Sequence, residues 1–255
     1  MTLSFETPGQ FIPLHYHSQM LADEPRMRGF RAAIDLRLPS GGKAVDLGGG
    51  TGVLSFFAAA KATQVWCVEL NPALAATAER LLRLNGCAGA VTVVPADAAA
   101  FVPPEPVDLV ICEMLHSAML REKQIAVISA FKRGYAARFP GRLPAFVPEA
   151  TFLAAQPVDQ DFVFDGYAAP IPLFSNPLFS QERTRGLAEP AVYALLRYHE
   201  TLPEEFQWQG VFDITQDGTL NALRFVTKNV LAIVLDENRT IDWHNLYPVS
   251  YTHLT

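Results

Sequence analysis

Short apolar runs alternate with helical patterns as far as about residue 140 of the chain. The runs are KAVDL (43–47), QVWCVEL (64–70), AVTVVPAD (90–97) and VDLVICE (107–113). Apolar positions recur at helical spacing in residues 19–36, 53–62, 72–86 and within 117–137. Strands that are apolar along almost their whole length are typical of parallel sheets with helical crossovers. The pattern therefore predicts an α/β domain whose sheet is covered on both faces.

Beyond about residue 140 the pattern changes to short strand-like runs punctuated by prolines. The runs are TFLAAQPV (151–158), DFVFDGY (161–167), FQWQGVFDI (206–214) and ALRFVTKNVLAIVLD (222–236). One helical pattern, AVYALLRYHE (191–200), interrupts them. This texture predicts an antiparallel β module, a sandwich or a barrel, appended to the α/β domain. We place the first domain at residues 1–144 and the second at 145–248.

The last seven residues, VSYTHLT (249–255), read as the translation of a transposase sequencing adapter, gtc tct tat aca cat ctg acg. The two adapter bases before them would complete the codon of Pro248. We therefore exclude residues 249–255 from functional reasoning, as one would a fusion scar. We expect the natural protein to continue differently beyond Pro248.

The composition is that of a globular protein, with half of the residues hydrophobic and 18% charged. The net charge of −6, with no Lys or Arg run longer than two residues, argues against a nucleic-acid partner and favours a cationic or neutral substrate. The three cysteines are scattered, so we expect neither a disulfide framework nor a metal site. Without a signal-peptide pattern or an apolar run of transmembrane length, we expect a cytoplasmic protein with no membrane partner.

A glycine-rich turn, VDLGGGTG (45–52), lies between the first strand and the next helix, where an open α/β sheet binds its ligand. Gly48, Gly50 and Gly52 let the backbone approach that ligand closely. The dinucleotide fingerprint G-x-G-x-x-G, counted from Gly48, would need glycine at position 53, where the chain has valine. The turn instead matches the D-x-G-x-G-x-G loop of S-adenosylmethionine (SAM)-dependent methyltransferases, with Asp46 as its acid.

Acidic residues lie at the ends of three consecutive strands beside this turn. Asp46 is in the first strand, Glu69 is at the end of the second, and Asp97 is at the end of the third. An acid at the second position binds ribose hydroxyls in such folds, and the third position is where they contact adenine. A single strand-end acid is commonly a solvated charge. Three acids beside a glycine turn favour SAM over a nicotinamide or another nucleotide.

The chain resembles the protein arginine N-methyltransferase family over most of its length. Its segment HYHSQMLADEPRM (15–27) is similar to the family's helix motif I-H-E-E-M-L-x-D-x-x-R. The positions that match in register are His17, Met20, Leu21, Asp23 and Arg26. The resemblance implies that Arg26 pairs with the SAM carboxylate, that His17 lies nearby, and that Met20 flanks the reacting methyl.

The glycine loop and the segments after it also resemble the family. VDLGGGTGVLSFFAAAKA (45–62) is similar to the SAM loop with its helix, and Glu69 matches the ribose acid. The family's adenine-binding acid falls on Ala98 in an ungapped alignment and on Asp97 after a shift of one residue, and we prefer Asp97. PGRLPAFVPEATFLAAQPV (140–158) resembles the crossing into the family's β-barrel domain. The SAM-binding residues implied are His17, Met20, Arg26, Asp46, Gly48, Gly50, Glu69 and Asp97.

Glu113 and Glu122 match the two glutamates of the family's double-E loop, including their nine-residue spacing. On one straight helix, at about 100° per residue, they would point to opposite faces. We therefore expect Glu113 to end the fourth strand and a loop to return Glu122 toward it. Two carboxylates can bind the planar fork of a guanidinium and draw its charge away from the reacting nitrogen. A carboxylate or water takes the proton. Otherwise the two glutamates are unrelated surface charges.

Two loops depart from the family pattern. MLH (114–116) follows the first glutamate where the family has Trp-Met-Gly, and IDW (241–243) replaces the family's Thr-His-Trp. Trp243 would wall the substrate slot and Asp242 would bind a cation, unless they are a core tryptophan and a turn aspartate. The family dimerises through a helical arm in its barrel, so we expect a homodimer, with residues 176–200 as a short arm.

We therefore expect an α/β, Rossmann-like SAM-methyltransferase domain with a C-terminal, mostly antiparallel β-barrel-like module. The expected activity is methyl transfer from SAM to a guanidinium nitrogen, with arginine in a protein or peptide as the leading substrate. The alternatives are a small guanidino or amine metabolite as substrate, and a SAM-binding module without activity. CEML (112–115) stands where methyltransferases of nucleic-acid bases carry an N-P-P-Y type motif, so no nucleic-acid substrate is expected.

Overall fold

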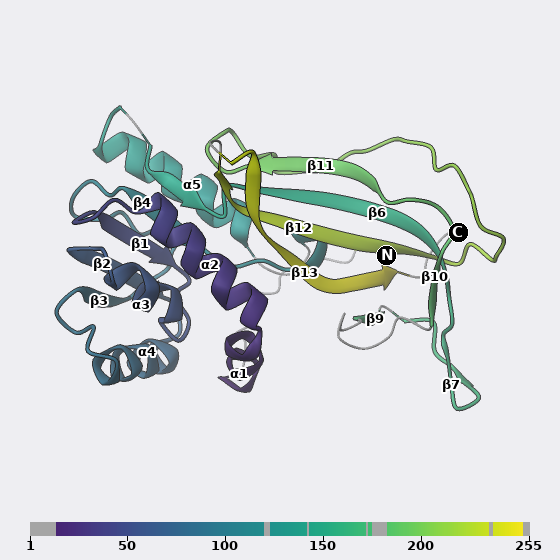
Figure 1. The fold of residues 1–255 in the computed structure, drawn as a ribbon, viewed down its shortest axis with the longest axis horizontal. Coiled ribbons are helices and arrows are strands. Elements are labelled where there is room, and N and C mark those ends of the chain that lie inside the picture. Colours follow the sequence, from purple (N-terminus) through teal and green to yellow (C-terminus); the bar gives the residue numbers. More distant parts are fainter. Residues whose placement is uncertain are drawn as a thin grey trace.

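The described part of the chain contains two large sheets and a small two-stranded one, with helices packed around the first large sheet (Figure 1). The computed structural model describes residues 14–119, 123–141, 143–171, 173–174, 183–234 and 237–251. None of the helices within these ranges is long and apolar enough to cross a membrane.

The first half of the chain forms a five-stranded parallel sheet. Its strands are β1 (Lys43–Leu47), β2 (Gln64–Glu69), β3 (Val91–Pro95), β4 (Leu109–Cys112) and β5 (Ala145–Val147). The helices are α1 (Leu14–Ala22), α2 (Glu24–Arg37), α3 (Val53–Ala59), α4 (Pro72–Leu84) and α5 (Gln124–Arg138), with a 3₁₀ turn, η1 (Ser117–Met119). The strand order is β3-β2-β1-β4-β5, and every neighbouring pair is parallel. The predicted α/β domain is confirmed.

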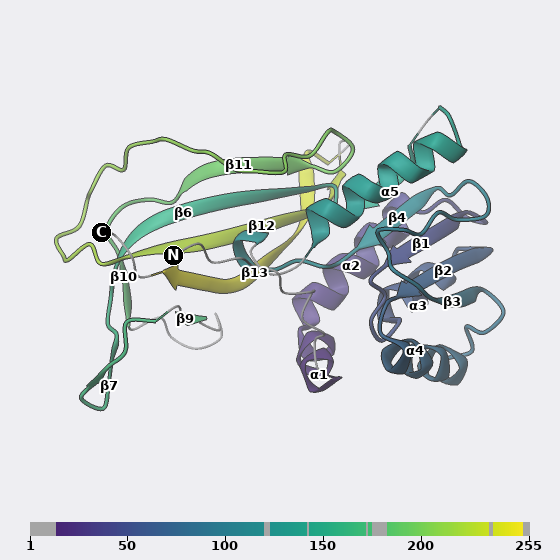
Figure 2. The ribbon, with the colours of Figure 1, turned by 180° about the vertical axis from the view of Figure 1, so that it is seen from behind.

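Alternate residues of the strands enter two separate apolar clusters. Ala44 packs with Phe30 of α2 and Leu54 of α3, whereas Val45 packs with Phe131 of α5. Because successive side chains of a strand point to opposite faces, α2 and α3 cover one face of the sheet and α5 covers the other (Figure 2). Burial on both faces explains why the strand sequences are almost wholly apolar.

The helical pattern at residues 19–36 is interrupted at Asp23, so α1 and α2 are two helices instead of the single one predicted. The Asp23 side chain caps α2 by accepting a hydrogen bond of 3.0 Å from the backbone nitrogen of Arg26. Pro25, in the first turn of α2, lacks the N–H that a continuous helix would need. The interruption therefore follows from the local sequence DEP (23–25).

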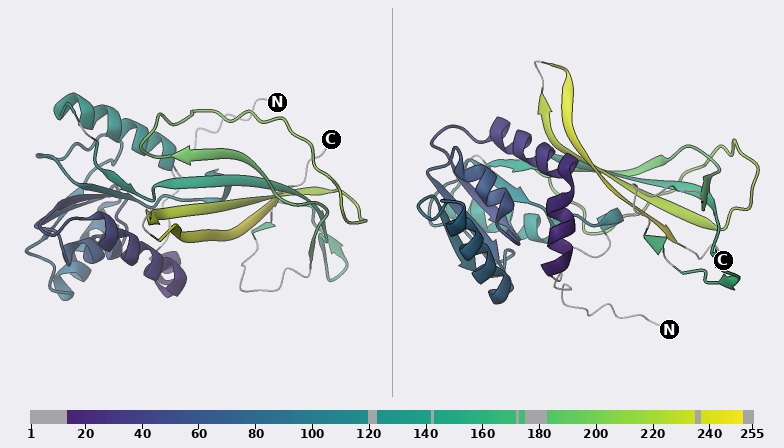
Figure 3. Two further views of the ribbon diagram at one scale, coloured as in Figure 1. Left: turned by 45° about the horizontal axis from the view of Figure 1, so that its top comes forward. Right: turned by 60° about the horizontal axis from the view of Figure 1, so that its bottom comes forward.

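The second half of the chain forms an antiparallel sheet that curls into half a barrel (Figure 3). Its strands are β6 (Ala150–Gln160), β9 (Leu173–Phe174), β10 (Thr184–Gly186), β11 (Ala191–Arg197), β12 (Ala222–Val234) and β13 (Arg239–Tyr251). The order is β10-β6-β12-β13-β9, and β11 also pairs with β6. A separate hairpin consists of β7 (Val163–Phe164) and β8 (Tyr167–Ala168). The predicted antiparallel β module is confirmed.

The predicted helix AVYALLRYHE (191–200) is wrong, because its first seven residues form β11. This strand runs antiparallel to β6, with Leu195 opposite Phe152. Leu196 and the following Tyr198 are fully buried, at 1% and 0% exposure. Helical spacing of Ala and Leu is a local preference, and pairing with a neighbouring strand overrides it here.

Two further expectations concern the barrel. Residues 206–214, predicted as a strand, are irregular, and Val211 is 88% exposed. A short helical arm within 176–200 is also wrong for the described part, since residues 184–186 and 191–197 are strands. Residues 176–182 lie outside the described ranges. Of the terminal segment that reads as adapter sequence, residues 249–251 complete β13.

Helix α2 joins the two sheets into one core (Figure 3). Phe30 of α2 belongs to the same apolar cluster as Leu231 of β12 and Trp243 of β13. The Phe30 and Trp243 ring centroids lie 6.2 Å apart. Gly29 permits this approach, because a β-carbon there would lie 2.9 Å from a methyl carbon of Leu231. The barrel strands are thereby held against the helix that borders the pocket described next.

Candidate active site

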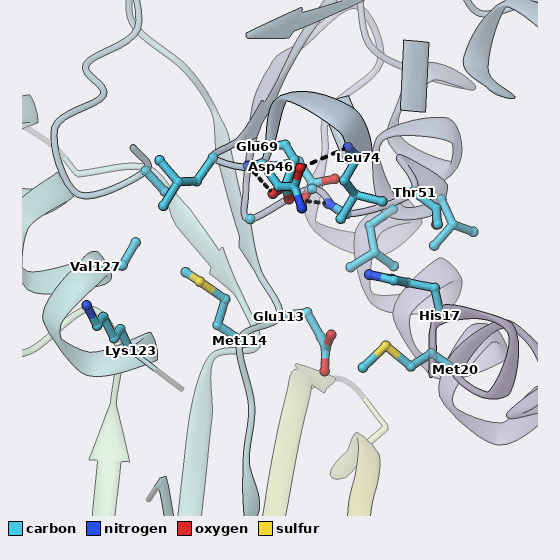
Figure 4. A pocket seen from close by; sticks show the side chains of 18 of the residues that line it. His17, Met20, Asp46, Thr51, Glu69, Leu74, Glu113, Met114, Lys123 and Val127 are labelled. Carbon is cyan, nitrogen blue, oxygen red and sulfur yellow. Dashed lines mark hydrogen bonds between the residues drawn. The ribbon is translucent and has the colours of Figure 1, made fainter. Parts of the chain in front are cut away.

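A pocket of about 530 Å³ opens at the carboxyl ends of the parallel strands, the edge where open α/β sheets bind ligands (Figure 4). Its walls come from the segments that follow four strands, from α1 and from the first turn of α5. The predicted residues that line it are His17, Met20, Arg26, Asp46, Gly48, Gly50, Glu69, Asp97 and Glu113. Residues from distant parts of the sequence are thus brought together around one cavity.

Glu69 fixes the glycine turn to the end of β2. Its carboxylate accepts a hydrogen bond of 3.0 Å from the backbone nitrogen of Gly50 and one of 2.8 Å from that of Asn71. Gly50 has a φ of 57°, and a β-carbon there would lie 3.1 Å from the ring of His17. The turn therefore requires glycine at this position. Two backbone donors bind the Glu69 carboxylate, and no Lys or Arg within the described ranges pairs with it.

Asp46 lies beneath the turn and is only 1% exposed. Its Oδ2 accepts a hydrogen bond of 2.7 Å from the Ser55 hydroxyl. Burial raises the pKa of Asp46 to about 7, hydrogen bonds from Ser55 oppose the rise, and the negative charges of Glu113 and Glu69 add to it. Asp46 thus supports the turn from inside, and its ionisation depends on the two glutamates of the pocket.

Helix α1 borders the pocket over the glycine turn. Burial lowers the pKa of His17, the Glu69 carboxylate partly restores it, and the Arg26 guanidinium lowers it further. The Nε2 atom of His17 is buried and has no hydrogen-bond partner within the described part of the chain. Met20 lies in the same wall and points into the pocket (Figure 4). A polar ligand would satisfy the buried ring nitrogen, which is costly to leave without a partner.

A buried ion pair joins α2 to the end of β4. Nη2 of Arg26 donates to Oε2 of Glu113, and the two side chains are 8% and 11% exposed. Burial raises the pKa of Glu113, and the Arg26 guanidinium opposes this rise. The same guanidinium lies over the Trp243 ring, 5.2 Å from its centroid. Trp243 Nε1 in turn donates to Asp23 Oδ2 at 3.2 Å. One guanidinium is thus held between a carboxylate and an aromatic face.

The other predicted residues differ in their relation to the pocket. Asp97 and Ala98 both line it, so either of the two positions expected for the adenine acid can face a ligand. Asp242 lies outside the set of lining residues and pairs with Lys228 at 2.8 Å. Its Oδ1 is buried without a hydrogen-bond partner in the described ranges. Trp243 is also outside that set, but its ring contacts the guanidinium of Arg26, which does line the pocket.

The segment after Glu113 turns back on itself. β4 ends one residue earlier, η1 occupies residues 117–119, and α5 begins at Gln124. Ala118 and Met119 have φ values of 55° and 57°, in the left-handed region where the chain can reverse. The prediction that residues 111–124 do not form one straight helix is confirmed. Glu122 itself lies outside the described residues, so its position opposite Glu113 stays a prediction.

Sequence reasoning missed two residues that border this turn. Lys123 lines the pocket next to Met114, and Gln124 is buried at the first position of α5 (Figure 4). Gln124 Oε1 accepts from the Met114 nitrogen at 2.9 Å, and Gln124 Nε2 donates to the Cys112 carbonyl at 2.8 Å. In the sequence Gln124 is simply a polar residue two positions after Glu122. Its identity alone does not show whether its amide is buried or exposed.

The polar groups of this pocket fit SAM. The cofactor carries a carboxylate, an amino group and ribose hydroxyls. Arg26 Nε is buried with no partner in the described chain, as is His17 Nε2, so the wall holds two groups that lack a polar partner. The glycine turn leaves room for a ligand next to the backbone, and the Glu69 carboxylate can accept from ribose hydroxyls.

Comparison with known proteins adds family evidence to this geometry. A methyltransferase-domain family matches residues 44–135. An uncharacterised protein of Methanothermobacter thermautotrophicus is 32% identical over 219 residues, which cover 85% of this chain and 78% of that protein. The arginine N(omega)-methyltransferase of Streptomyces achromogenes subsp. streptozoticus is 30% identical over 112 residues, which are 42% of this chain and only 31% of that enzyme.

Among solved structures, protein arginine methyltransferase 10 of Arabidopsis thaliana superposes with a TM-score of 0.78 at 15% identity. The superposition covers 95% of this chain and 83% of the plant protein, so both the parallel sheet and the half barrel are included. At this identity the likeness establishes the fold. The domain match shows that the chain carries a SAM-dependent methyltransferase domain, and its fold is that of the protein arginine methyltransferases.

Proposed function

We propose that this protein transfers a methyl group from SAM to a guanidinium nitrogen, with arginine in a protein or peptide as the substrate. One observation carries the proposal: Glu113 already binds a guanidinium, that of Arg26, at the wall of the pocket. Burial raises the pKa of Glu113, a nearby cation favours its charged form, and a forked guanidinium is well suited to that role. The pair uses Oε2 of Glu113, and Oε1 accepts no hydrogen bond from the part of the chain that the structure describes.

The residues around the glycine turn would hold the cofactor. SAM, when bound, supplies an electrophilic methyl group on a sulfonium. We assign the ribose hydroxyls to Glu69 and the adenine to Asp97. The buried donor atoms of Arg26 and His17, which lack partners among the described residues, support assigning the amino-acid end of SAM to that wall.

Glu113 has two tasks in this proposal. Its negative charge holds the substrate guanidinium and draws positive charge toward the nitrogens that do not react. The remaining nitrogen gains lone-pair character, and it loses one proton to a carboxylate or to water as it is methylated. Glu122 would bind the second edge of the guanidinium. The absence of water around a buried carboxylate strengthens each of these electrostatic effects.

A small guanidino compound is the second candidate substrate, and specific observations favour it. The relative from Streptomyces is by name an arginine N(omega)-methyltransferase, without mention of protein. Two loops of this chain, 114–116 and 241–243, also depart from the family pattern beside the pocket. Both candidates share the guanidinium and the role of Glu113, and they differ in what the rest of the substrate is.

Transfer of a labelled methyl group from SAM into a cell extract tests the proposal. The extract is divided into protein, RNA and small-molecule fractions. We expect label in protein that is recovered as methylated arginine after hydrolysis. Label confined to the small-molecule fraction would select the second candidate. Label confined to RNA would exclude both. Tight SAM binding with no label in any fraction would identify a binding module without activity.

A further inference from the structure

Gln124 contacts the backbone on both sides of Glu113. Its Oε1 accepts from the Met114 nitrogen at 2.9 Å, and its Nε2 donates to the Cys112 carbonyl at 2.8 Å. These two groups belong to the peptide bonds that precede and follow Glu113. Because peptide bonds are planar, fixing both planes fixes the φ and ψ of the residue between them. The direction of the Glu113 side chain is therefore set by one amide group.

The Gln124 amide is itself fixed by a buried hydrogen-bond network. Its side chain bonds the Tyr198 hydroxyl, which lies 2.8 Å from Thr151 Oγ1. Thr151 also donates to Asn229 Oδ1 at 2.8 Å. All four residues are 0% exposed, and burial raises the pKa of Tyr198, so the phenol keeps its proton. Asn229 Nδ2 has no hydrogen-bond partner among the described residues, and the bonds that the four side chains do make are costly to break at such depth.

The network connects Glu113 to the barrel. Tyr198 follows β11, Thr151 is in β6, and Asn229 is in β12 directly opposite Trp243 of β13. Trp243 contacts the guanidinium that pairs with Glu113. The Glu113 backbone and the partner of its carboxylate are thus both held by barrel strands. The Gln124 contacts do not involve Glu69 or Asp97, the residues assigned to the ribose and the adenine.

We infer that Gln124 is a positioning residue that orients Glu113 toward the substrate guanidinium, supported by Tyr198, Thr151 and Asn229. The inference rests on the proposed function, because Glu113 is the residue that it positions. Loss of the Gln124 amide is expected to disturb the Glu113 carboxylate and to leave Glu69 and Asp97, the residues assigned to the ribose and the adenine, in place. A misplacement of about 1 Å in such a group lowers a rate by roughly 100-fold.

Gln124→Met tests this inference, because methionine has a similar length and no hydrogen-bonding amide. The exchange rate of the Met114 amide is expected to rise about tenfold or more, as its acceptor is lost. The kcat for methyl transfer is expected to fall roughly 10- to 100-fold, while the KM for SAM stays within about twofold. Tyr198→Phe, which removes only the supporting hydroxyl, is expected to lower kcat by roughly three- to tenfold.

Gln156→Met is the matched control. Gln156 is a buried glutamine of β6 that donates to the Ala188 carbonyl at 2.7 Å and does not line the pocket. Its substitution is expected to lower stability without changing kcat per folded molecule or the exchange of the Met114 amide. Equal loss of kcat in both methionine variants would show a merely structural effect and overturn the inference.

Three further results would overturn it. They are an unchanged Met114 exchange rate, an unchanged kcat despite faster exchange, and a SAM affinity that falls as much as kcat. Wild-type protein that methylates no guanidinium at all would instead refute the proposed function. The Met114 exchange rate would then decide alone whether Gln124 holds the Glu113 backbone.

Discussion

Two glutamates of the same pocket are held in opposite ways. Glu69 ends β2, and its oxygens accept from the backbone nitrogens of Gly50 and Asn71. Glu113 follows β4, and its carboxylate pairs with the guanidinium of Arg26. Backbone donors are part of the fold, whereas a guanidinium on a side chain can be exchanged for another guanidinium. In the proposed function, the cofactor side of the pocket is therefore fixed by backbone donors, and the substrate side is held by a side-chain charge that a substrate can replace.

The largest expected effect comes from removing the charge of Glu113. In Glu113→Gln the amide has nearly the same shape, but it can no longer draw positive charge from a guanidinium. We expect the rate of methyl transfer to fall roughly 100- to 1,000-fold, as when one electrostatic partner of a transition state is removed. SAM affinity, measured by calorimetry, is expected to change less than the transfer rate does, because Arg26 keeps its charge and Glu69 is untouched.

Glu149→Gln provides the control for that variant. Glu149 forms an ion pair with Arg37 that resembles the Glu113 pair, but it does not line the pocket. We expect this substitution to leave the transfer rate per folded molecule within about twofold of wild type. If Glu113→Gln retained full activity on the substrate found by labelling, the proposal that the charge of Glu113 holds the substrate guanidinium would be wrong.

Glu69→Gln changes the glutamate that is held by backbone donors. We expect it to weaken SAM affinity more than it lowers kcat, and by a smaller factor than the loss of rate in Glu113→Gln. The amide would direct an N–H toward the backbone donors of Gly50 and Asn71, which cannot accept it. Loss of charge-assisted hydrogen bonds of this kind weakens SAM affinity by roughly 10- to 100-fold. At saturating SAM, kcat should recover most of its value. Glu79→Gln, on the exposed face of α4, is the control and should bind SAM normally. An unchanged affinity in Glu69→Gln would remove Glu69 from the cofactor site.

The parallel sheet was predictable from the sequence because its constraints are local. Strands such as KAVDL (43–47) are buried on both faces, so nearly every residue carries the signal. The barrel was less predictable because its strands are decided by distant partners. β11 has helical spacing in its sequence and becomes a strand through its pairing with β6, more than thirty residues earlier in the chain. The break at Asp23 had a visible signal, DEP, that the spacing of apolar residues concealed.

The residues of the candidate site also differ in how well the sequence predicts them. Resemblance identified residues that carry their own charge or backbone freedom, such as Arg26, Gly50 and Glu113, and the fold brings these to one cavity. It gave no sign of Gln124, because an uncharged amide near a helix start is ordinary until its contacts are known. Residues whose importance lies in what they hold, and not in their own chemistry, are the ones that sequence patterns miss.

The smallest expected effect concerns the stability of the protein and depends on Asp46. The charges of both Glu113 and Glu69 raise the pKa of this residue, so it links the two glutamates of the pocket. Its pKa of about 7 in the folded protein lies above its ordinary value of 3.8. The unfolded chain therefore loses this proton at lower pH than the folded protein does, so the free energy of unfolding falls as pH rises through 7. Between pH 6 and 8 this loss is about 1 kcal/mol.

Asp46→Asn cannot ionise and retains an oxygen that can accept from Ser55, so the variant should lack this loss while remaining folded. Urea titrations at pH 6, 7 and 8 measure the difference, with Asp35→Asn, an exposed aspartate of α2, as the control. Glu113→Gln, made as a single substitution, removes one of the negative charges that raise the Asp46 pKa. The fall in the free energy of unfolding should then occur at lower pH than in the wild type. An identical pH dependence in wild type and Asp46→Asn would show that Asp46 titrates normally and that the two sides of the pocket do not communicate through it.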